Sequence, residues 1–551
     1  MEKILFIVPP HIGYHSFMNP AVGEHKDTIS KYLPQGILSI SAYLKKHSNV
    51  DVRLLDFNTF LSRGDQFEYD SYAELYNEVL NKQEFIDFSP DYIGLSILFS
   101  SAFNNSNEIA KLAKALFPES MIIAGGGVPT ALSKDIYSET DCFDATCFGE
   151  GEKPLLALLQ AEDKKALLMS HPSWITRDKT SSKFPVATEF IEDLDEIPFF
   201  DFSLANLDAY QINFTVSHFR GAKNTTTLPI HTSRGCPHHC CFCATHQAHG
   251  RTMRYHSITR VKRDLIRLKE EYGAKRILIS DDNFTADHDR AKQLFEYMGK
   301  QGFEIHCQGG FTMHSLSREM LSTMKNAGLS SIYLPIESGS EKVLQKIMHK
   351  PLKLNIVDKV VDNCRLLGID TVGFIVLGLP GETKADIQDS IDYLKSLKVN
   401  WYNITIATPL LGSELYDICK ENGYFKGDPF TSDFRRPVIN TEDFTPEYIE
   451  RKAYEMNLLL NFVNNLDMRD GKYKEALNRF KSVSNACNDH AFAFYFMARC
   501  YQQLHDTENF LSAAGKYEKI ISGSDFWKSY ADKLELPPLE NTSKSTELKV
   551  G

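Results

Sequence analysis

One short stretch decides the fold: HTSRGCPHHCCFC, which occupies residues 231–243. Three of its cysteines, Cys236, Cys240 and Cys243, have a C-x3-C-x2-C spacing. Thiolates this close in sequence converge on one point only if the backbone between them curls into a loop, which a neighbouring glycine and proline favour. Thiolates are soft ligands that suit zinc, copper(I) or iron–sulfur clusters. A structural zinc or an ordinary cluster takes four protein ligands, so three cysteines predict a cluster with one iron left open.

Two other interpretations of these cysteines stay open on spacing alone. They could be three buried core residues. They could also be half of a zinc site, because histidines that might complete it stand close by in the sequence, at His238, His239, His246 and His249. Cys241 falls outside the spacing and is predicted to take no part in ligation.

The composition is that of a globular protein with several domains. The 551 residues leave room for about three or four domains of ordinary size. The formal net charge of −11 argues against a surface that binds nucleic acid. No run approaches the ~20 apolar residues of a membrane span, and the N-terminus lacks a signal-peptide pattern. Eleven cysteines with one clustered triad fit a reducing cytoplasm better than a disulfide framework.

Residues 1–165 alternate strands and helices, which predicts an α/β domain with a doubly wound parallel sheet. Its strands are expected at Lys3–Pro9, Val50–Phe57, Asp91–Leu98, Met121–Ala124 and Ala145–Phe148. Ligands of such a sheet lie beyond the carboxyl ends of the strands. Two glycine-rich turns, at residues 125–130 and 149–152, stand at those ends, although each could be a plain tight turn.

Residues 226–440 form a second α/β array of six strand–helix units, which predicts a partial (β/α)6 TIM-like barrel. A proline-punctuated linker, 166–225, joins the two arrays. The six strands are expected at Pro229–Ser233, Arg276–Ser280, Glu304–Gly309, Ser331–Ile336, Thr371–Leu377 and Trp401–Ala407. Polar or glycine-rich groups follow four of them, at residues 280–283, 308–310, 337–340 and 378–382. Each group alone could cap a helix or form a turn, but together they mark the end of a barrel where chemistry takes place.

The cysteine loop follows the first strand of the second array, has Phe242 before its last cysteine, and precedes a helix from about Ser257. This arrangement resembles the radical SAM superfamily. The resemblance implies that Cys236, Cys240 and Cys243 hold a catalytic 4Fe–4S cluster whose open iron binds S-adenosylmethionine (SAM).

The same resemblance assigns further cofactor contacts in the second array. Asp282 would approach the SAM ammonium group, and Glu337, with Ser338 beside it, would accept hydrogen bonds from the ribose. The stretch from 373 to 382, which includes Gly378, would back the adenine through its main chain. Arg254 is either a further contact or a surface charge.

The first array resembles the cobalamin-binding half of cobalamin-dependent radical SAM enzymes, and the resemblance covers about residues 1–430. It is carried by residues 34–38, which open a helix, by the two glycine-rich turns and by residues 194–198. The residues implied at the cobalamin site are Ser100, Ser101, Gly125, Gly126, Gly127, Thr130 and Glu150. Ser100 and Ser101 would face the corrin, and the glycines with Thr130 would line the nucleotide tail. The D-x-H-x-x-G motif is missing, which implies that no histidine binds the lower face of cobalt.

By resemblance, the chain is a cobalamin-dependent radical SAM enzyme that methylates an unactivated carbon of a small-molecule or peptide-derived substrate. A 5′-deoxyadenosyl radical would remove hydrogen, methylcobalamin would supply the methyl group, and flavodoxin or ferredoxin would supply electrons. Alternatives are a rearrangement, cyclisation or oxidation with the same cofactors, and a non-catalytic cobalamin sensor or scaffold. A tRNA methylthiotransferase would want a second cysteine triad and a basic RNA-binding module. The sequence leaves substrate and oligomeric state undetermined.

The last segment, 441–551, is predicted to be helical. Similar turns at residues 471–477 and 505–510 lie close to one period of a tetratricopeptide repeat (TPR) apart. The segment is therefore either a short TPR-like unit that could bind a protein partner or a plain helical extension. The tail after Pro537 is expected to be disordered.

Overall fold

The structure is a computed structural model that describes residues 1–19, 32–61, 67–181, 185–210, 225–307, 309–428, 430 and 436–539. Gln308, part of the linker and the tail from residue 540, for which the sequence made predictions, lie outside the described residues.

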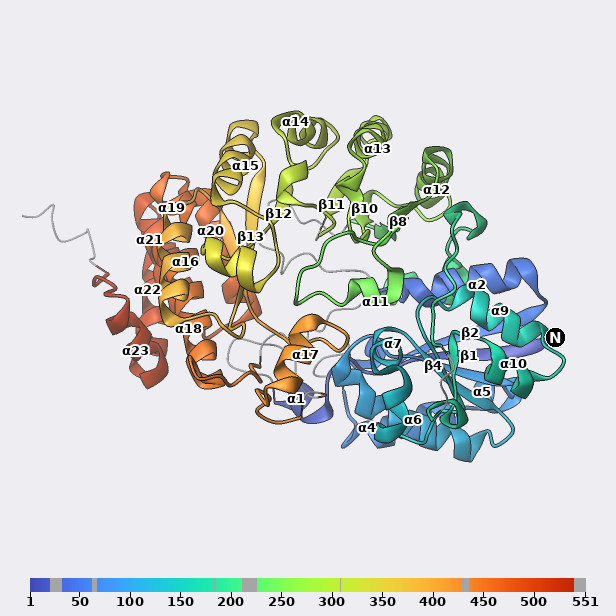
Figure 1. Ribbon diagram of the computed structural model, residues 1–551. Coiled ribbons are helices and arrows are strands. Elements are labelled where there is room, and N and C mark those ends of the chain that lie inside the picture. The colour runs from blue at the N-terminus through green and yellow to red at the C-terminus, as the bar shows by residue number, and fades with distance from the viewer. Residues whose placement is uncertain are drawn as a thin grey trace, which may run out of the picture.

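A six-stranded sheet forms the centre of the N-terminal part (Figure 1). Its order is β2 (Val50–Asp56), β1 (Glu2–Val8), β3 (Tyr92–Ser96), β4 (Met121–Gly125), β5 (Ala145–Cys147) and β6 (Trp174–Ile175). The first five strands are parallel and match the five expected strands. The edge strand β6 is antiparallel and comes from residues expected to be irregular linker. Strand β6 pairs through only two residues, and so short a strand shows no alternation of apolar and polar residues in the sequence.

Each face of this sheet has its own hydrophobic core because alternate side chains of a strand point to opposite faces. Ile4, Phe6 and Val8 pack with helices α2 (Gln35–His47) and α9 (Glu152–Gln160). Leu5 and Ile7 pack with α4 (Tyr72–Leu80) and α6 (Phe103–Leu116) on the other side. The shorter helices are α1 (Tyr14–Met18), α3 (Asn58–Leu61), α5 (Gln83–Phe88), α7 (Gly127–Leu132), α8 (Ile136–Glu139) and α10 (Lys164–Ser170). A parallel sheet covered on both faces is the doubly wound arrangement that the sequence predicts.

Two three-stranded parallel sheets form the second part of the molecule. One has the order β11 (Glu304–Cys307), β10 (Arg276–Ile279), β7 (Thr227–Ile230), and the other β12 (Ser331–Glu337), β13 (Asp370–Leu377), β14 (Trp401–Ile406). A single parallel bridge, Ile305 to Leu329, links the two sheets. All six expected strands are present.

Helices alternate with these strands, and in Figure 1 those that follow β7, β10, β11 and β12 lie along the outside of the sheets. They are α12 (Ile258–Glu270), α13 (His288–Lys300), α14 (Arg318–Asn326), α15 (Leu354–Leu367), α16 (Lys384–Ser396) and α17 (Glu414–Glu421). Strands and helices share one hydrophobic core that runs through both sheets. A small hairpin of β8 (Ser233–Arg234) and β9 (Arg254–Tyr255) follows β7 and encloses the cysteine loop with α11 (Thr245–His249).

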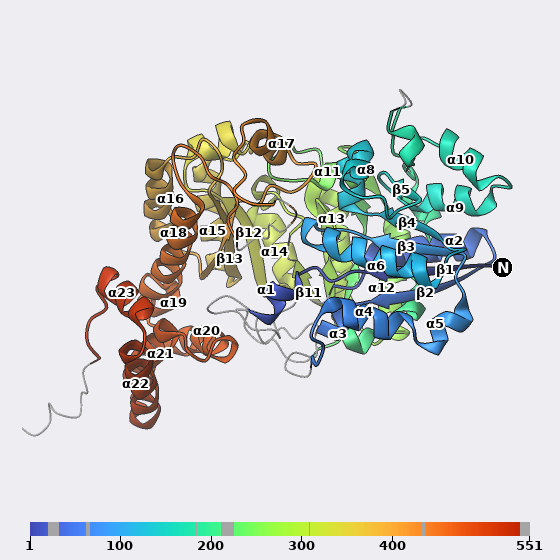
Figure 2. The same cartoon turned by 90° about the horizontal axis from the view of Figure 1, so that it is seen from below.

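The C-terminal helices extend the molecule beyond β14, as Figure 2 shows. They are α18 (Pro446–Leu458), α19 (Leu466–Arg469), α20 (Tyr473–Ala486), α21 (Ala491–Gln503), α22 (Thr507–Ser522) and α23 (Asp525–Lys533). Their core includes Val372 and Trp401 from the strands. The buried Asn461 side chain accepts a hydrogen bond from the backbone N–H of Tyr402 (2.7 Å) and donates one to its carbonyl (2.8 Å). The Asn461 side chain thus pairs with the backbone N–H and carbonyl of Tyr402 at the edge of β14, as a neighbouring strand would.

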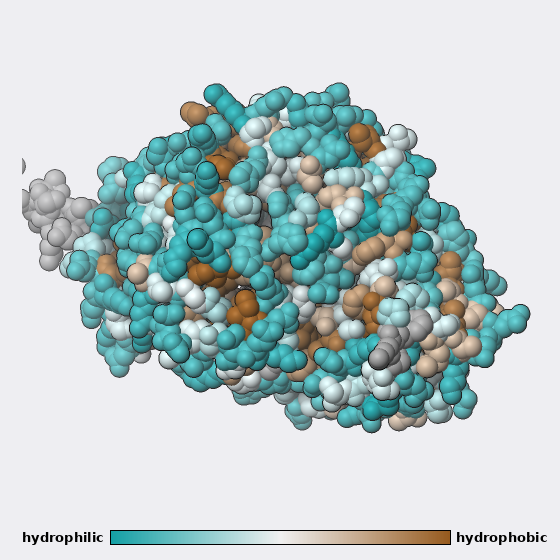
Figure 3. Space-filling model, viewed as in Figure 1, coloured by the Kyte–Doolittle hydropathy of each residue, from teal (hydrophilic) through white to brown (hydrophobic). Residues whose placement is uncertain are grey.

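The surface shown in Figure 3 is largely hydrophilic, with apolar residues in small groups. Among the described residues, no helix has both the length and the apolar character needed to cross a membrane.

Candidate active site

Backbone hydrogen bonds close the cysteine loop. The N–H of Cys236 donates to the carbonyl of Gly250 (3.3 Å), and the N–H of Cys243 donates to that of Cys240 (3.1 Å). Gly235 has φ +97°, and a Cβ there would lie 2.3 Å from the Thr252 carbonyl oxygen, so only glycine fits this turn. The three cysteines that share the predicted spacing are all partly exposed. The loop therefore presents three thiols on one short, tightly folded segment.

Cys241 behaves differently, as the spacing predicts. Its side chain is 2% exposed and belongs to the core of the second unit. Its backbone N–H donates to the Met348 carbonyl (3.1 Å), and its carbonyl accepts from the N–H of Leu415 (2.8 Å). Cys241 is thus an anchor that fastens the loop to two later segments.

Burial raises the pKa of the Cys240 thiol to about 11 and also raises the pKa of Cys236. Such thiols become good ligands when a metal supplies positive charge. No group of three or more His, Cys, Asp or Glu side chains within the described residues is arranged to hold a metal ion.

Two aspartates at the end of β10 support the cysteine loop. Asp282 accepts a hydrogen bond from the Gly235 N–H (3.0 Å), so it braces the start of the loop. The buried Asp281 accepts three more, from the backbone and hydroxyl of Thr232 and the hydroxyl of Ser233 (2.5–2.7 Å). The expected contact of Asp282 with the SAM ammonium group stays a prediction.

The other expected SAM contacts lie at the ends of β12 and β13. Glu337 is 8% exposed, has a positive φ of 66°, and pairs with Lys350 at 2.9 Å. Ser338 is 1% exposed and its hydroxyl contacts that of Ser390 (3.0 Å), so it points into the protein. Gly378 has φ +88°, and a Cβ there would lie 2.9 Å from the Ile449 side chain of α18. Lys350 was not found from the sequence, because nothing in its local pattern links it to Glu337.

The expected cobalamin contacts lie at the carboxyl end of the first sheet. Ser100 and Ser101 form a short 3-10 turn after β3, and the Ser101 hydroxyl donates to the His11 carbonyl (2.5 Å). Thr130 is buried, and its hydroxyl accepts from the Gly149 N–H (3.0 Å). One contact ties the loop after β3 to the loop after β1, and the other ties the turn after β5 to the segment after β4.

The glycines of the 125–127 loop have a packing role that the sequence did not reveal. Gly126 has φ +106°, and a Cβ there would lie 2.8 Å from the Ile97 carbonyl oxygen. A Cβ at Gly127 would lie 2.8 Å from the Leu98 carbonyl oxygen. Substitution at either position would therefore disturb the end of β3 whether or not a ligand approaches.

Glu150, expected at a cofactor, joins the two α/β units. Arg254 forks around its carboxylate (2.6 and 3.0 Å), and Arg234 and His249 each approach it at 3.2 Å. Burial alone would raise the pKa of Glu150, but the hydrogen bond from His249 and the charges of the two arginines hold it well below its usual range. Arg254 is only 6% exposed, so it is no surface charge. A direct cofactor contact by Glu150 stays a prediction.

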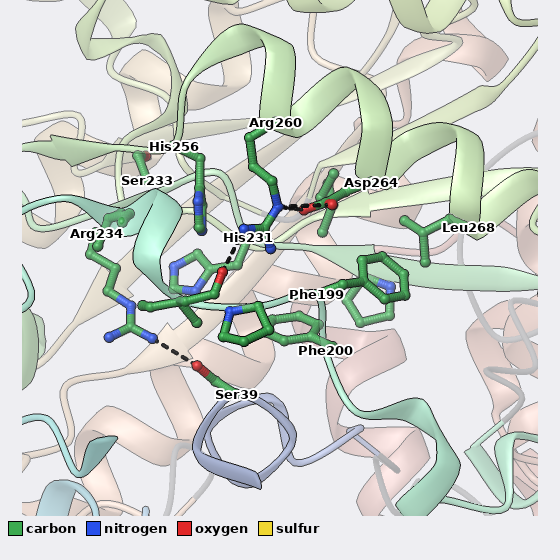
Figure 4. Close-up of a pocket in the computed structure, with 15 residues that line it drawn as sticks. Ser39, Phe199, Phe200, His231, Ser233, Arg234, His256, Arg260, Asp264 and Leu268 are labelled. Atoms are coloured by element: carbon green, nitrogen blue, oxygen red, sulfur yellow. Dashed lines mark hydrogen bonds and ion pairs between the residues drawn. The ribbon is translucent and has the colours of Figure 1, made fainter. Parts of the chain in front are cut away.

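A small cavity of about 30 Å³ lies beside this network (Figure 4). Its labelled lining comes from α2 (Ser39), the linker (Phe199, Phe200), the start of the cysteine loop and α12. The buried Nε2 atom of His231, which lines the cavity, has no hydrogen-bond partner. A space of this size holds a water or two and none of the expected cofactors.

By the chemistry of their side chains, and not by a metal-holding arrangement already present, the described residues suit the expected groups on both sides of the interface. Three partly buried thiols in one loop are a suitable donor set for a cluster with an open iron. The Asn283 Oδ1 atom, at the end of β10, is buried without a partner. Across the interface, Leu98 is 51% exposed, and burial lowers the pKa of His11 to about 4, with its Nδ1 unpartnered. An exposed apolar side chain and a neutral imidazole suit the apolar face of a corrin.

Comparisons with known proteins agree with this two-part site. The Radical SAM superfamily matches residues 230–394, and the B12 binding domain matches residues 30–159. The chain is 28% identical to the cytidylyl-2-hydroxyethylphosphonate methyltransferase of Streptomyces wedmorensis, over 73% of this chain and 80% of that protein.

Two solved structures share the fold. The cobalamin-dependent SAM radical enzyme OxsB with aqua-cobalamin bound superposes with a TM-score of 0.63 at 16% identity, covering 97% of this chain and 80% of OxsB. The SAM radical methyltransferase TsrM from Kitasatospora setae, with tryptophan and a SAM analogue, gives 0.58 at 13% identity, covering 93% of this chain and all of TsrM.

Proposed function

Because this chain belongs to the cobalamin-binding radical SAM enzymes, we propose that it methylates an unactivated carbon of a small-molecule or peptide-derived substrate. Its cofactors are a 4Fe–4S cluster, SAM and cobalamin. When bound, these groups supply a radical that removes hydrogen from the substrate and a methyl group that replaces it. The protein holds the groups in place and keeps water out.

The observation that carries the proposal is that the carboxyl ends of the two strand arrays meet. Gln35, at the start of α2, donates to the Ser280 hydroxyl at the end of β10 (3.2 Å). Gln247 of α11 donates to the Gly412 carbonyl after β14 (3.1 Å), and a Cβ on Gly412 would touch Ala131 of α7. Cysteine loop and cobalamin loops therefore border one space.

In this proposal Cys236, Cys240 and Cys243 bind the cluster, while Asp282, Glu337, Ser338 and Gly378 shape the SAM site. Ser100, Ser101, Gly125, Gly126, Gly127, Thr130 and Glu150 shape the cobalamin site. Lys350 is added as the group that orients Glu337, since their ion pair fixes one carboxylate oxygen.

The six strands of the second part act as a partial (β/α)6 barrel in this proposal. The domains are residues 1–165 for cobalamin, 166–225 as linker, 226–440 for the cluster and SAM, and 441–551 as a TPR-like unit that could bind a partner. All eleven cysteines are free, which supports a reducing, cytoplasmic setting for the enzyme. Flavodoxin or ferredoxin is the proposed electron donor.

The substrate is not carried over from the relatives. The named relative acts on a cytidylyl phosphonate, and TsrM was solved with tryptophan, so related proteins serve different chemistry. The rival function is a rearrangement, cyclisation or oxidation with the same cofactors, which the same docked geometry would serve.

The test is turnover by protein reconstituted anaerobically with iron, sulfide and cobalamin. Methylation consumes one SAM as radical source and one as methyl donor, so 5′-deoxyadenosine and S-adenosylhomocysteine should form in roughly equal amounts. Glu337→Ala should depress both products together, because one ribose anchor serves both SAM molecules. Glu304→Ala is the control, since its half-exposed carboxylate pairs with Arg276 at the opposite end of the strands. Turnover with 5′-deoxyadenosine and no S-adenosylhomocysteine would favour the rival function.

A further inference from the structure

We infer that Glu150 is a positioning residue through which the cobalamin domain holds the cluster loop closed, so that cobalamin and the cluster stabilise each other's binding. The inference rests on the proposed function for the identity of the two cofactors. It assigns to Glu150 a role in linking them.

The first step is the place of the two arginines. Arg234 and Arg254 are paired residues of the β8–β9 hairpin. They stand at the two ends of the cysteine loop, and each is 6% exposed. Both guanidinium groups reach the Glu150 carboxylate, with nitrogen–oxygen distances of 2.6–3.2 Å. One carboxylate from the cobalamin domain therefore binds both ends of the loop.

The second step concerns the interior of the loop. His249 approaches the same carboxylate through Nδ1, and its carbonyl accepts a hydrogen bond from Arg254 (3.1 Å). The next residue, Gly250, accepts the hydrogen bond of the Cys236 N–H. Glu150 thus contacts His249, and the residue after His249 supplies the carbonyl that orients the backbone of Cys236.

The third step leads to the cobalamin side. Glu150 follows Gly149, whose N–H is held by the Thr130 hydroxyl in the loop expected at the nucleotide tail. Glu152 extends the link: it accepts from Arg234 (2.6 Å) and from Ser39 of α2 (2.7 Å). The contact to Ser39 from Arg234 is drawn in Figure 4.

The charges in this link are balanced and buried. Glu150 and Glu152 are 4% and 3% exposed, and two arginines face them. Removing one member of such a set leaves an uncompensated buried charge, so the loop and the turn must separate or rearrange. If the loop is ordered only when the turn after β5 is in place, occupancy of either cofactor site favours the other.

The experiment measures this coupling directly with the full-length protein. Aqua-cobalamin is titrated into iron-free and cluster-reconstituted protein, and the ratio of the two Kd values is the coupling factor. We expect the cluster to tighten cobalamin binding about 5-fold or more. Linkage requires cobalamin to strengthen cluster binding by the same factor, seen as greater iron retention against a chelator.

Glu150→Gln keeps the shape of the side chain and removes its charge. In this variant the ratio of the two Kd values should fall to near one, whatever the Kd for cobalamin itself becomes. Arg254→Lys keeps the positive charge but cannot donate to both carboxylate oxygens of Glu150 at once. The ratio of Kd values is measured in this variant if Glu150→Gln does not fold. Asp467→Asn is the matched control, because it breaks a buried ion pair with Arg479 far from the loop.

The outcomes separate this inference from the proposed function. A wild-type ratio in a folded Glu150→Gln or Arg254→Lys variant overturns the inference, as does loss of coupling in Asp467→Asn. If cluster and cobalamin are coupled in the wild-type protein and lose that coupling in the Glu150 variant, but no methylated product forms, only the proposed function is overturned. A wild-type chain that binds no cobalamin overturns both.

Discussion

At the scale of single residues, the cysteine loop separates three partly exposed thiols from one buried thiol. Cys236, Cys240 and Cys243 are partly exposed, whereas Cys241 lies in the core and bonds through its backbone to two other segments. The spacing set Cys241 apart from the other three, since a residue one position out of the pattern points elsewhere, and the family resemblance supplied the expectation that those three bind a cluster.

Changing all three spaced cysteines to alanine should remove about four irons per chain and the visible absorption of the cluster. Cys241→Ala should keep the iron and lower stability by about 1 kcal/mol, because it only trims a packed side chain. Iron and sulfide analysis after reconstitution checks both. Retention of iron in the triple variant would contradict the cluster assignment.

Other residues carry roles that no local pattern predicts. The sequence placed Gly126 at a ligand, and the structure adds that its Cβ would strike the carbonyl oxygen of Ile97. It placed Glu150 at a cofactor, and the structure adds that both carboxylate oxygens accept hydrogen bonds from Arg254, 104 positions away. Contacts across such separations depend on how whole domains dock, which spacing and periodicity do not encode.

At the scale of elements, the strands were predicted well because buried parallel strands read as continuous apolar runs bounded by polar turns. The two-residue strands β6, β8 and β9 were missed because they are too short to show a period. The C-terminal helices were predicted as helical, and the burial of nearly every side chain in the first ten residues of α21 explains the apolar run from Ala491 to Tyr501.

Helix α21 should be sensitive to acid through its cap. The buried His490 accepts from the Ala493 N–H through Nδ1 and stacks on Phe462. Burial lowers its pKa to about 4, with Asp489 opposing the shift, so the fold requires a neutral imidazole. The stability that it contributes is full above pH 6.5 and is lost as the pH falls towards 4.

Between pH 7 and 5 this loss should amount to about 2 kcal/mol. Hydrogen exchange of α21 amides, corrected for intrinsic rates, checks it. His490→Asn keeps a cap acceptor that does not titrate, and should remove this pH dependence. An unchanged pH dependence in that variant would show that another group is responsible.

At the scale of the whole molecule, the two α/β units are joined on two sides. The ionic link around Glu150 lies on one side. On the other, the segment after β14 crosses back: Leu411 belongs to a core of the first sheet, and Phe430 stacks on Phe103 of α6 at 4.8 Å. From the sequence only the linker was expected to join the two units. This second connection was missed because apolar residues in a loop show no period.

Leu411→Ala should weaken the docking by about 2–5 kcal/mol, because the side chain is 7% exposed within that core. We expect faster hydrogen exchange in the loops after β4 and β14, and 5′-deoxyadenosine formed in excess of S-adenosylhomocysteine. Leu366→Ala is the control, since that leucine is 71% exposed. Equal exchange in both variants would mean that the segment does not hold the units together.

The position of Leu411 also bears on synthesis of the chain at the ribosome. Domains generally fold as units, with the N-terminal one first. Here a core of the first sheet lacks one of its side chains until residue 411 has emerged. The first unit to be translated is therefore completed only after all six strands of the second have been made, and a nascent chain stalled before that point would leave the place of Leu411 in that core open.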